Sequence, residues 1–351
     1  MAKIDSFLRE MVKLGGSDLH LCSEMAPKTR IHGDLTPLPF PPIPAAEMLG
    51  IMEEIATHEK WSWFLENKDQ DFAYEIPGLA RFRVNFMYNH FGPGAVLRII
   101  PTNIKTIDDL KLPPVLREVC QYNRGLVLVT GPTGSGKSTT LAALINLINQ
   151  RRPCHIITIE DPIEFVHPHG MALVEQREVG EDTHSFANAL KYVLREDPDV
   201  ILIGEMRDPE TIAAALTAAE TGHLVFATLH TNDVCQAVDR IIDVFPADQQ
   251  GQIRTQLAAS LECIVSQRLM PKNSRSGGRI AAFEILVGTT AVRALIRESK
   301  THQIPSLLET SAKYGMITLA KALRNLFDQN LITRETFRSM LPAGVDPESI
   351  A

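Results

Sequence analysis

The feature that most constrains this chain is a glycine-rich loop set between an apolar run and an apolar, helix-forming stretch. Residues 125–129 predict a buried strand, and the eight residues after Thr130 match the pattern G-x-x-x-x-G-K-[ST]. These residues are Gly131, Pro132, Thr133, Gly134, Ser135, Gly136, Lys137 and Ser138. A strand before such a loop and a helix after it predict a phosphate-binding loop (P-loop), and with it a bound nucleoside triphosphate.

Each residue type in the loop has a chemical reason to be there. Glycines let the main chain curl closely enough for several N–H groups to face a polyphosphate. We expect Lys137 at the β and γ phosphates, the Ser138 hydroxyl on Mg²⁺, and Thr139 near the α phosphate. The positive end of the following helix faces the same anion. The alternative, an ordinary glycine-rich turn, is disfavoured by the flanking strand and helix.

Length and composition bound the class of protein. The 351 residues exceed the size at which single cores stop growing, and 44% of them are hydrophobic, so we expect two domains with real cores. A net charge of −7 gives no general footprint for nucleic acid or for an anionic membrane surface. The five cysteines form no C-x-x-C pair, which favours a reducing, cytosolic compartment over a disulfide framework or a zinc site.

No segment of the sequence predicts membrane insertion. The first five residues, Met-Ala-Lys-Ile-Asp, lack the apolar core of a signal peptide, and no uncharged apolar run approaches the roughly 18 residues that a spanning helix needs. We therefore expect any membrane association to go through a partner.

A proline-rich change of composition at residues 101–114 predicts a linker between two domains. Before it, residues 7–14 have the pattern of an amphipathic helix and residues 81–88 alternate as a strand does, which indicates a small α+β domain. Residues 38–44 contain four prolines and are expected to be irregular. The predicted organisation is an N-terminal domain at 1–100, a linker at 101–115 and a core at 116–351.

Short apolar strands alternate with helices after the linker, which predicts a parallel sheet covered by helices. The expected strands are 126–129, 156–159, 200–203 and 224–228, and the expected helices are 138–149, 186–194 and 211–220. Asp208 should cap the third helix, with Pro209 in its first turn and Gly222 just past its end. From residue 233 onward the pattern is mostly helical, with one strand-like run at 279–286.

Carboxylates follow two of the predicted strands, at the edge where parallel sheets bind their ligands. Glu205 is expected to meet Mg²⁺ or the attacking water. Glu160 and Asp161 are expected near the metal, and Glu164 is the favoured residue for orienting water. The alternative for each residue taken singly is that it caps the next helix.

Two histidines, His223 and His230, bracket the predicted strand at 224–228. A histidine beside an apolar strand is more often structural, so sensing of phosphate is the less favoured interpretation from composition alone. Metal ligation is weaker still, because no cysteine or H-x-x-x-H pair completes a site.

Four motifs in a fixed order carry a resemblance to a known family. The P-loop is followed by Thr-Ile-Glu-Asp-Pro-Ile-Glu-Phe, then Gly-Glu-Met-Arg-Asp, then Thr-Gly-His-Leu-Val-Phe-Ala-Thr-Leu-His-Thr. The order resembles the hexameric secretion ATPase superfamily, and most closely the type IV pilus retraction ATPases PilT and PilU. The resemblance covers nearly the whole chain, including Gly-Ser-Asp-Leu-His-Leu at residues 16–21.

The resemblance implies a fold and a set of roles. The fold would be α/β, with a small PAS-like α+β domain before a RecA-like P-loop core and a helical C-terminal region. Glu160, Asp161 and Glu164 would form the family's aspartate box, Glu205 its Walker B acid, and His223 and His230 its histidine box. Arg81, Arg83 and Arg98 fall where the family brings arginines to the nucleotide at a subunit boundary. The alternative for Arg81 and Arg83 is the solvated face of a strand.

The resemblance also implies a motor that uses ATP and Mg²⁺. It would be a homohexamer that acts on an inner-membrane pilus platform protein, and so works at the cytoplasmic face of that membrane. Assembly and secretion motors usually carry an extra N-terminal domain and a four-cysteine zinc insertion, neither of which is found here, and this favours retraction. The alternatives left open are an assembly or type II secretion motor, and an accessory ATP-binding paralogue that docks on another retraction motor.

The C-terminal helical region raises one further expectation. Arg293 and Arg297 are candidates for a contact or coupling element, although Val292, Leu295 and Ile296 keep the spacing of a simple packed helix. Residues 291–298 depart at two positions from the PilT signature, and the linker around residues 112–114 looks more like PilU. The motifs therefore leave the paralogue open.

Overall fold

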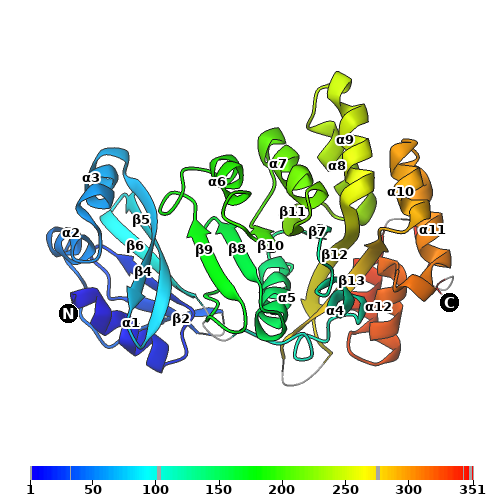
Figure 1. Cartoon of the computed structure of the whole chain (residues 1–351). Coiled ribbons are helices and arrows are strands. Elements are labelled where there is room, and N and C mark those ends of the chain that lie inside the picture. The colour runs from blue at the N-terminus through cyan, green and yellow to red at the C-terminus, as the bar shows by residue number, and fades with distance from the viewer. Residues whose placement is uncertain are drawn as a thin grey trace. The chain divides into compact units, whose positions relative to one another are not determined.

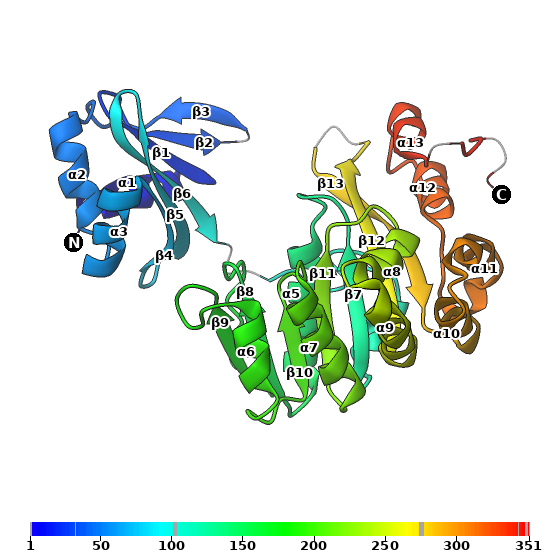
Figure 2. The same cartoon turned by 90° about the horizontal axis from the view of Figure 1, so that it is seen from above.

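The structure, a computed structural model, describes residues 2–31, 33–100, 104–273, 277–342, 344–347 and 350. The chain divides into two compact units, one of residues 1–103 with 164–166 and one of residues 104–163 with 167–351. Figures 1 and 2 show the elements of each unit, coloured from blue at the N-terminus to red at the C-terminus.

A six-stranded antiparallel sheet forms the first unit, in the order β3-β2-β1-β6-β5-β4. Its strands are β1 (Asp18–Cys22), β2 (Lys28–Ile31), β3 (Asp34–Pro37), β4 (Asp69–Ile76), β5 (Ala80–Asn89) and β6 (Gly92–Ile100). Its helices are α1 (Lys3–Lys13), α2 (Ala45–Glu53) and α3 (His58–Asn67). Residues 38–44 are irregular, as their prolines predict.

Strand β5 shows why one face of this sheet is buried and the other is polar. Phe82, Val84 and Phe86 are fully buried and pack in one cluster with residues of all three helices, whereas Arg81 and Arg83 point to the other face because side chains alternate along a strand. The predicted helix at 7–14 and strand at 81–88 are therefore confirmed, with each element starting a little earlier than predicted.

A seven-stranded sheet forms the centre of the second unit, in the order β13-β12-β7-β11-β10-β8-β9. Its strands are β7 (Gly125–Thr130), β8 (His155–Glu160), β9 (Leu173–Glu178), β10 (Val200–Ile203), β11 (Leu224–Leu229), β12 (Leu261–Pro271) and β13 (Arg279–Val287). All neighbours are parallel except the pair β12 and β13. The four predicted parallel strands are confirmed.

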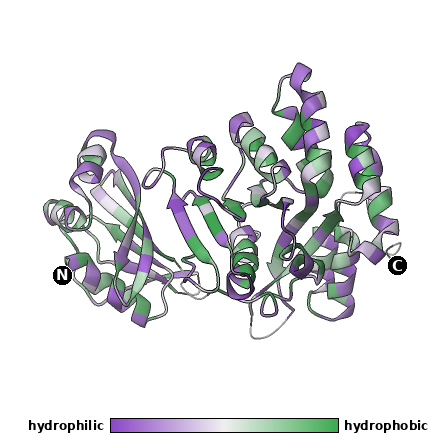
Figure 3. Cartoon of the chain, in the orientation of Figure 1, coloured by the Kyte–Doolittle hydropathy of each residue, from purple (hydrophilic) through white to green (hydrophobic). Residues whose placement is uncertain are grey.

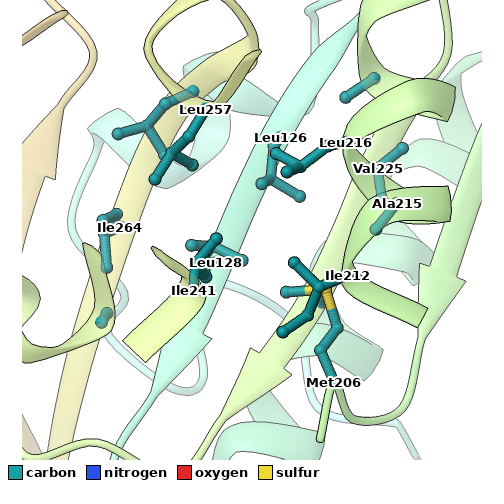
Figure 4. Packing of buried hydrophobic residues seen from close by; sticks show 14 of the residues in the cluster. Leu126, Leu128, Met206, Ile212, Ala215, Leu216, Val225, Ile241, Leu257 and Ile264 are labelled. Carbon is teal, nitrogen blue, oxygen red and sulfur yellow. The ribbon is translucent and has the colours of Figure 1, made fainter. Parts of the chain in front are cut away.

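Helices cover both faces of this sheet, which is why its strands β7, β8, β10 and β11 are largely apolar. On one face lie α6 (Phe186–Val193), α7 (Pro209–Glu220), α8 (Val234–Asp243) and α9 (Ala247–Ser260), and on the other lie α4 (Val115–Val119) and α5 (Lys137–Arg151). Leu126 and Leu128 of β7 face the first group and are shown in Figure 4 among Ile212, Leu216 and other buried side chains. Asp208 accepts a hydrogen bond from the Thr211 N–H at 2.8 Å, which confirms the predicted cap of α7.

The C-terminal helices pack on the antiparallel edge of the sheet. They are α10 (Thr290–Arg297), α11 (Ile304–Thr310), α12 (Leu319–Asp328) and α13 (Arg334–Met340). Met270 and Ile280 of the β12 and β13 pair form a separate buried cluster with α12 and α13. Glu284 of β13 is largely buried and accepts from the first N–H of α8, Val234, at 3.0 Å and from that of α12, Leu319, at 3.3 Å. Burial raises the pKa of this carboxyl.

Two strands of the second unit were not predicted, and in the first unit only β5 was. Residues 261–271 were expected to belong to a mostly helical region but form β12, which was hidden because it is buried on both faces and follows α9 without a glycine or proline between them. β9 is an edge strand with charged residues, and Figure 3 shows it more hydrophilic than its neighbour β8. A segment in which polar and apolar residues do not alternate is therefore not necessarily helical.

Part of the predicted linker belongs to the second unit. Pro101, Thr102 and Asn103 lie outside the described residues, but Ile107 and Leu112 are buried in the cluster that contains α4 and α5. Within the part of the chain that the structure describes, none of the helices has the length and apolar character required to span a bilayer.

The buried His167 predicts a measurable dependence of stability on pH. It is 7% exposed, and burial lowers its pKa to about 4. Because the unfolded chain binds a proton at about pH 6.5 and the folded chain does not, the free energy of unfolding should fall as pH drops from 6.5 to 4, by up to about 3 kcal/mol. In His167→Phe, urea unfolding at pH 5 and 7 should show a smaller difference than in the wild type. The exposed control His302→Gln should keep the wild-type difference, and an equal difference in His167→Phe would contradict the assignment.

Candidate active site

The glycine-rich loop joins the carboxyl end of β7 to the start of α5. Thr130 ends the strand, α5 begins at Lys137, and Gly136 is its N-cap residue. The nine residues 131–139 thus form one continuous loop and helix start, as predicted. Because the first N–H groups of a helix have no helical carbonyl to bond, they can serve an anion placed before α5.

Two glycines in the loop lack room for a side chain as well as having a positive φ. Gly131 has φ +141°, and a Cβ there would lie 2.3 Å from the backbone oxygen of Gln267. Gly136 has φ +90°, and a Cβ there would lie 2.8 Å from the Gln267 side-chain nitrogen. Both positions therefore need the backbone freedom and the missing side chain of glycine.

The lysine of the loop is held close to the main chain. Lys137 is 8% exposed, and its Nζ donates to the carbonyl oxygens of Gly131 at 2.9 Å and Pro132 at 3.3 Å. An ammonium group in this place lies inside the curl of the loop, where it can neutralise phosphate charge.

Glu205 stands just beyond the carboxyl end of β10. Its Oε2 lies 2.8 Å from a guanidinium nitrogen of Arg207 and 3.4 Å from Nε2 of His230, which follows β11. The neighbouring strand β8 comes close because residue 204 is glycine: a Cβ there would lie 3.2 Å from Cα of Glu160. Adjacent parallel strands thus bring Glu160, Glu205 and His230 to the same edge of the sheet.

The three residues of the predicted acidic segment are not equivalent. Glu160 ends β8, and its Oε1 accepts from Thr158 Oγ1 at 2.7 Å and from Gln176 Nε2 at 3.1 Å. Asp161 is exposed at the same edge. Glu164 is exposed and belongs to the three residues that group with the first unit.

The structure separates the two histidines. His230 lies at the carboxyl end of β11 beside Glu205, but His223 precedes the amino end of that strand, about 20 Å away for six residues of extended chain. The ring of His223 instead contacts the Ala218 carbonyl oxygen at 2.9 Å and Thr221 Oγ1 at 3.3 Å, where it closes the end of α7. His230 thus lies beside Glu205, whereas the ring of His223 contacts the end of α7, and the implied role of His223 at the nucleotide stays a prediction.

Polar residues that were not predicted to be site residues connect the loop after β11 to the rest of the site. Thr130 Oγ1 accepts from the Thr231 N–H at 2.9 Å and lies 2.7 Å from Thr231 Oγ1. Ser266 of β12 donates to the Asn232 carbonyl at 3.0 Å. The segment that follows His230 is thereby fixed to the strand that carries the P-loop. Only the position of Thr231 directly after His230 could have suggested this from sequence.

The three predicted arginines lie on the polar face of the first unit. Arg81 and Arg83 are two residues apart on β5, and Arg98 of β6 is the cross-strand partner of Arg83. Like charges directly opposite one another are unfavourable in a sheet unless something compensates them. Arg98 donates to Asp18 Oδ1 at 2.6 Å, and the pKa of Asp18 is lowered because hydrogen bonds from Ser17 and Arg98 together outweigh its burial.

No group of three His, Cys, Asp or Glu side chains suited to a metal occurs among the described residues. A Mg²⁺ ion bound with a nucleotide usually takes one or two protein ligands and completes its shell with phosphate oxygens and water. Ser138 and Glu205 supply a hydroxyl and a carboxylate of the expected kind. Glu160 and Asp161, also predicted for the metal, lie at the same edge of the sheet.

The arginines of α10 differ from each other. Arg293 donates to the carbonyls of Gly288 at 2.7 Å and Ala259 at 2.8 Å and pairs with Glu262 at 2.8 Å. Val292 and Ile296 are fully buried, whereas Arg297 is exposed. The contacts of Arg293 therefore agree with the alternative of a simple packed helix. Of the two arginines, Arg297 is the one whose side chain is exposed.

Comparison with known proteins gives a consistent family. Residues 1–326 match the family described as Type II/IV secretion system protein. The chain is 48% identical over 335 residues to the type IV pilus retractation ATPase PilT of Pseudomonas aeruginosa, covering 95% of this chain and 97% of that one. It is 43% identical to the type IV pilus ATPase PilU of the same organism, covering 95% and 87% of the two chains.

Solved structures of similar proteins are consistent with the same family. A crystal structure of the pilus retraction motor PilT with bound ADP superposes with a TM-score of 0.91 at 45% identity, covering 99% of this chain and 98% of that one. The Legionella pneumophila ATPase DotB follows with a TM-score of 0.84 at 29% identity, covering 96% and 94%.

A P-loop at the end of the parallel strand β7, with an acidic residue at the end of β10 in the same sheet, defines the second unit as the core of a P-loop ATPase. The chain belongs to the Type II/IV secretion system protein family and, within it, is of the PilT and PilU type. The resemblance carried by the motifs and the predicted fold class are thus confirmed.

Proposed function

We propose that this chain is the ATPase of a ring-shaped motor that drives retraction of type IV pili and so twitching motility. The observation that supports this most directly is similarity over nearly the full length of two relatives that are named for pilus retraction, together with a P-loop and Glu205 at one edge of the sheet. Twitching motility also appears in the name of a Neisseria gonorrhoeae relative that is 50% identical over 312 residues.

The residues of this chain divide the chemistry as follows. The main chain of residues 131–136 and Lys137 hold the phosphates, and Ser138 and Glu205 are the residues that would hold Mg²⁺, with Glu160 and Asp161 beside them. When bound, that ion neutralises charge developing on the transferred phosphate. Glu164 orients the attacking water, while His230 beside Glu205 responds to the γ phosphate.

The assembly is proposed to be a homohexamer in which Arg81, Arg83 and Arg98 reach nucleotide at a subunit boundary. Guanidinium groups suit this because they are always charged and bind phosphate oxygens through two N–H groups. The motor would work in the cytoplasm, at the inner-membrane platform protein of the pilus. Movement between the two units would transmit the work of each turnover.

Electron microscopy of a deletion strain separates retraction from assembly. We expect cells without this protein to carry at least as many surface pili as the wild type, because pilins are still added but not withdrawn. Cells without pili would instead support the assembly or secretion motor.

Steady-state ATP turnover by the purified protein tests the second alternative, an accessory paralogue that docks on another retraction motor. Sustained turnover without a partner is expected. Nucleotide binding with no turnover until a paralogous motor is added would favour the accessory role, which similarity to PilU keeps as a specific alternative.

A further inference from the structure

The side chain of Gln267 connects β12 to the P-loop. It is 3% exposed, its Nε2 donates to the Ser135 carbonyl at 2.6 Å, and its Oε1 accepts from Thr140 Oγ1 at 2.8 Å. One amide thus uses its donor on the middle of the loop and its acceptor on the first turn of α5. Both contacts span more than 120 residues of sequence.

The backbone around Gln267 also limits where the loop can lie. The space for a Cβ on Gly131 is filled by the Gln267 carbonyl oxygen, and that on Gly136 by the Gln267 Nε2. Ser266, the preceding residue, is in register with Thr130 on the parallel strand β7. Residue 267 therefore touches the loop at its start, at its middle and at the entry to the helix.

This contact has a directional consequence for phosphate binding. In a trans peptide unit the C=O and N–H groups point in opposite directions. Because the Ser135 carbonyl is directed at Gln267, the Gly136 N–H in the same peptide unit must point away from β12. A phosphate-binding loop works by turning such N–H groups to the anion, so the orientation of this peptide decides how well the loop is formed before the ligand arrives.

The alternative is that the two hydrogen bonds only compensate for the burial of the Gln267 amide. This alternative explains the arrangement less well. The same strand places Cys263, Ile264 and Val265 in fully apolar surroundings, and a buried primary amide costs free energy unless both of its ends are hydrogen-bonded. An apolar residue would avoid that requirement. Both ends of the amide bond to the loop and its helix, which points to a role there.

We propose that Gln267 is a positioning residue for nucleotide binding, which holds the Ser135 peptide so that the P-loop is preorganised for the polyphosphate of a nucleoside di- or triphosphate. The inference rests on the proposed ATPase site. The side chain of Gln267 hydrogen-bonds to Ser135 and Thr140, which lie in the loop and in the first turn of α5 and not at the ends of β8 and β10, so it acts on affinity more than on the chemical step.

The test compares Gln267→Met, which keeps the length of the side chain and removes both hydrogen bonds, with the wild type. Titration with fluorescent ADP should give a Kd raised about tenfold, since two buried hydrogen bonds are lost. KM for ATP should rise by a similar factor while kcat changes less than about threefold. Cys263→Ala on the same strand is the matched control: it lowers the thermal midpoint by making a cavity but should leave KM unchanged.

A second variant keeps the test decisive if Gln267→Met fails to fold. Thr140→Val removes only the acceptor-side hydrogen bond, so ADP binding should weaken about threefold, and adding it to Gln267→Met should cause little further loss because the partners act together. Unchanged Kd and KM in folded Gln267→Met or Thr140→Val would overturn the inference. Failure of the wild type to bind ADP would instead overturn the proposed function.

Discussion

Glu205→Gln is expected to bind ATP and fail to hydrolyse it. The substitution keeps the shape of a side chain that contacts Arg207 at 2.8 Å and His230 at 3.4 Å, but it removes the negative charge needed to hold Mg²⁺ or polarise water. ATP binding should be retained because the loop at residues 131–138 holds the phosphates. This loop follows β7 and not β10. Loss of a residue in acid–base or metal-assisted work lowers kcat by roughly a hundredfold or more.

Phosphate release under saturating ATP measures the rate, and fluorescent ADP titration measures the binding. Glu175→Gln is the matched control, because Glu175 is an exposed carboxylate on β9 whose pair with His155 lies on the surface. It should retain wild-type turnover. Turnover by Glu205→Gln at half the wild-type rate or better would show that the acidic end of β10 is not the site of the chemistry.

Gly131→Ala is expected to abolish nucleotide binding at working concentrations. A Cβ at this position would lie 2.3 Å from the Gln267 backbone oxygen and 2.7 Å from Ser135 Oγ, in a residue with φ +141°. The clash cannot be relieved by a side-chain rotation, since β12 is paired with β7 on one side and β13 on the other. Backbone strain and overpacking together should cost about 2 to 6 kcal/mol.

Gly134→Ala in the same loop is the control for backbone conformation alone. Gly134 has φ +79°, but nothing lies within 4 Å of a Cβ there, so only a left-handed penalty of about 1 to 2 kcal/mol is expected. ADP titration and thermal unfolding should rank the wild type first, Gly134→Ala second and Gly131→Ala last. Equal effects of the two substitutions would mean that the packing of β12 on the loop does not matter.

Local signals in the sequence were sufficient for the elements that hold the nucleotide loop. The run 126–129 is apolar because β7 is covered by helices on both faces, and Asp208, Pro209 and Gly222 mark the ends of α7 through backbone chemistry that needs no tertiary contact. Glu205 was also predicted from a local signal, because it follows an apolar strand and parallel sheets bind ligands at the carboxyl ends of their strands.

Long-range contacts were not visible in the sequence. Nothing in Val-Ser-Gln-Arg at residues 265–268 indicates that Gln267 reaches back to Ser135, because that contact exists only once β12 pairs with β7. The separation of His223 from His230 has a related cause: two histidines that flank one strand look equivalent in a motif, but they lie at opposite ends of that strand. Arg83 and Arg98 became a pair only through the register of β5 and β6.

The most direct test of the central claim is live imaging of labelled pili in a deletion strain that expresses either the wild-type protein or Glu205→Gln. We predict that pili extend in both strains, that the wild-type protein restores retraction events, and that the variant does not. Retraction at the wild-type frequency in cells expressing only Glu205→Gln, or in the deletion strain itself, would contradict the account that ATP hydrolysis at this site drives retraction.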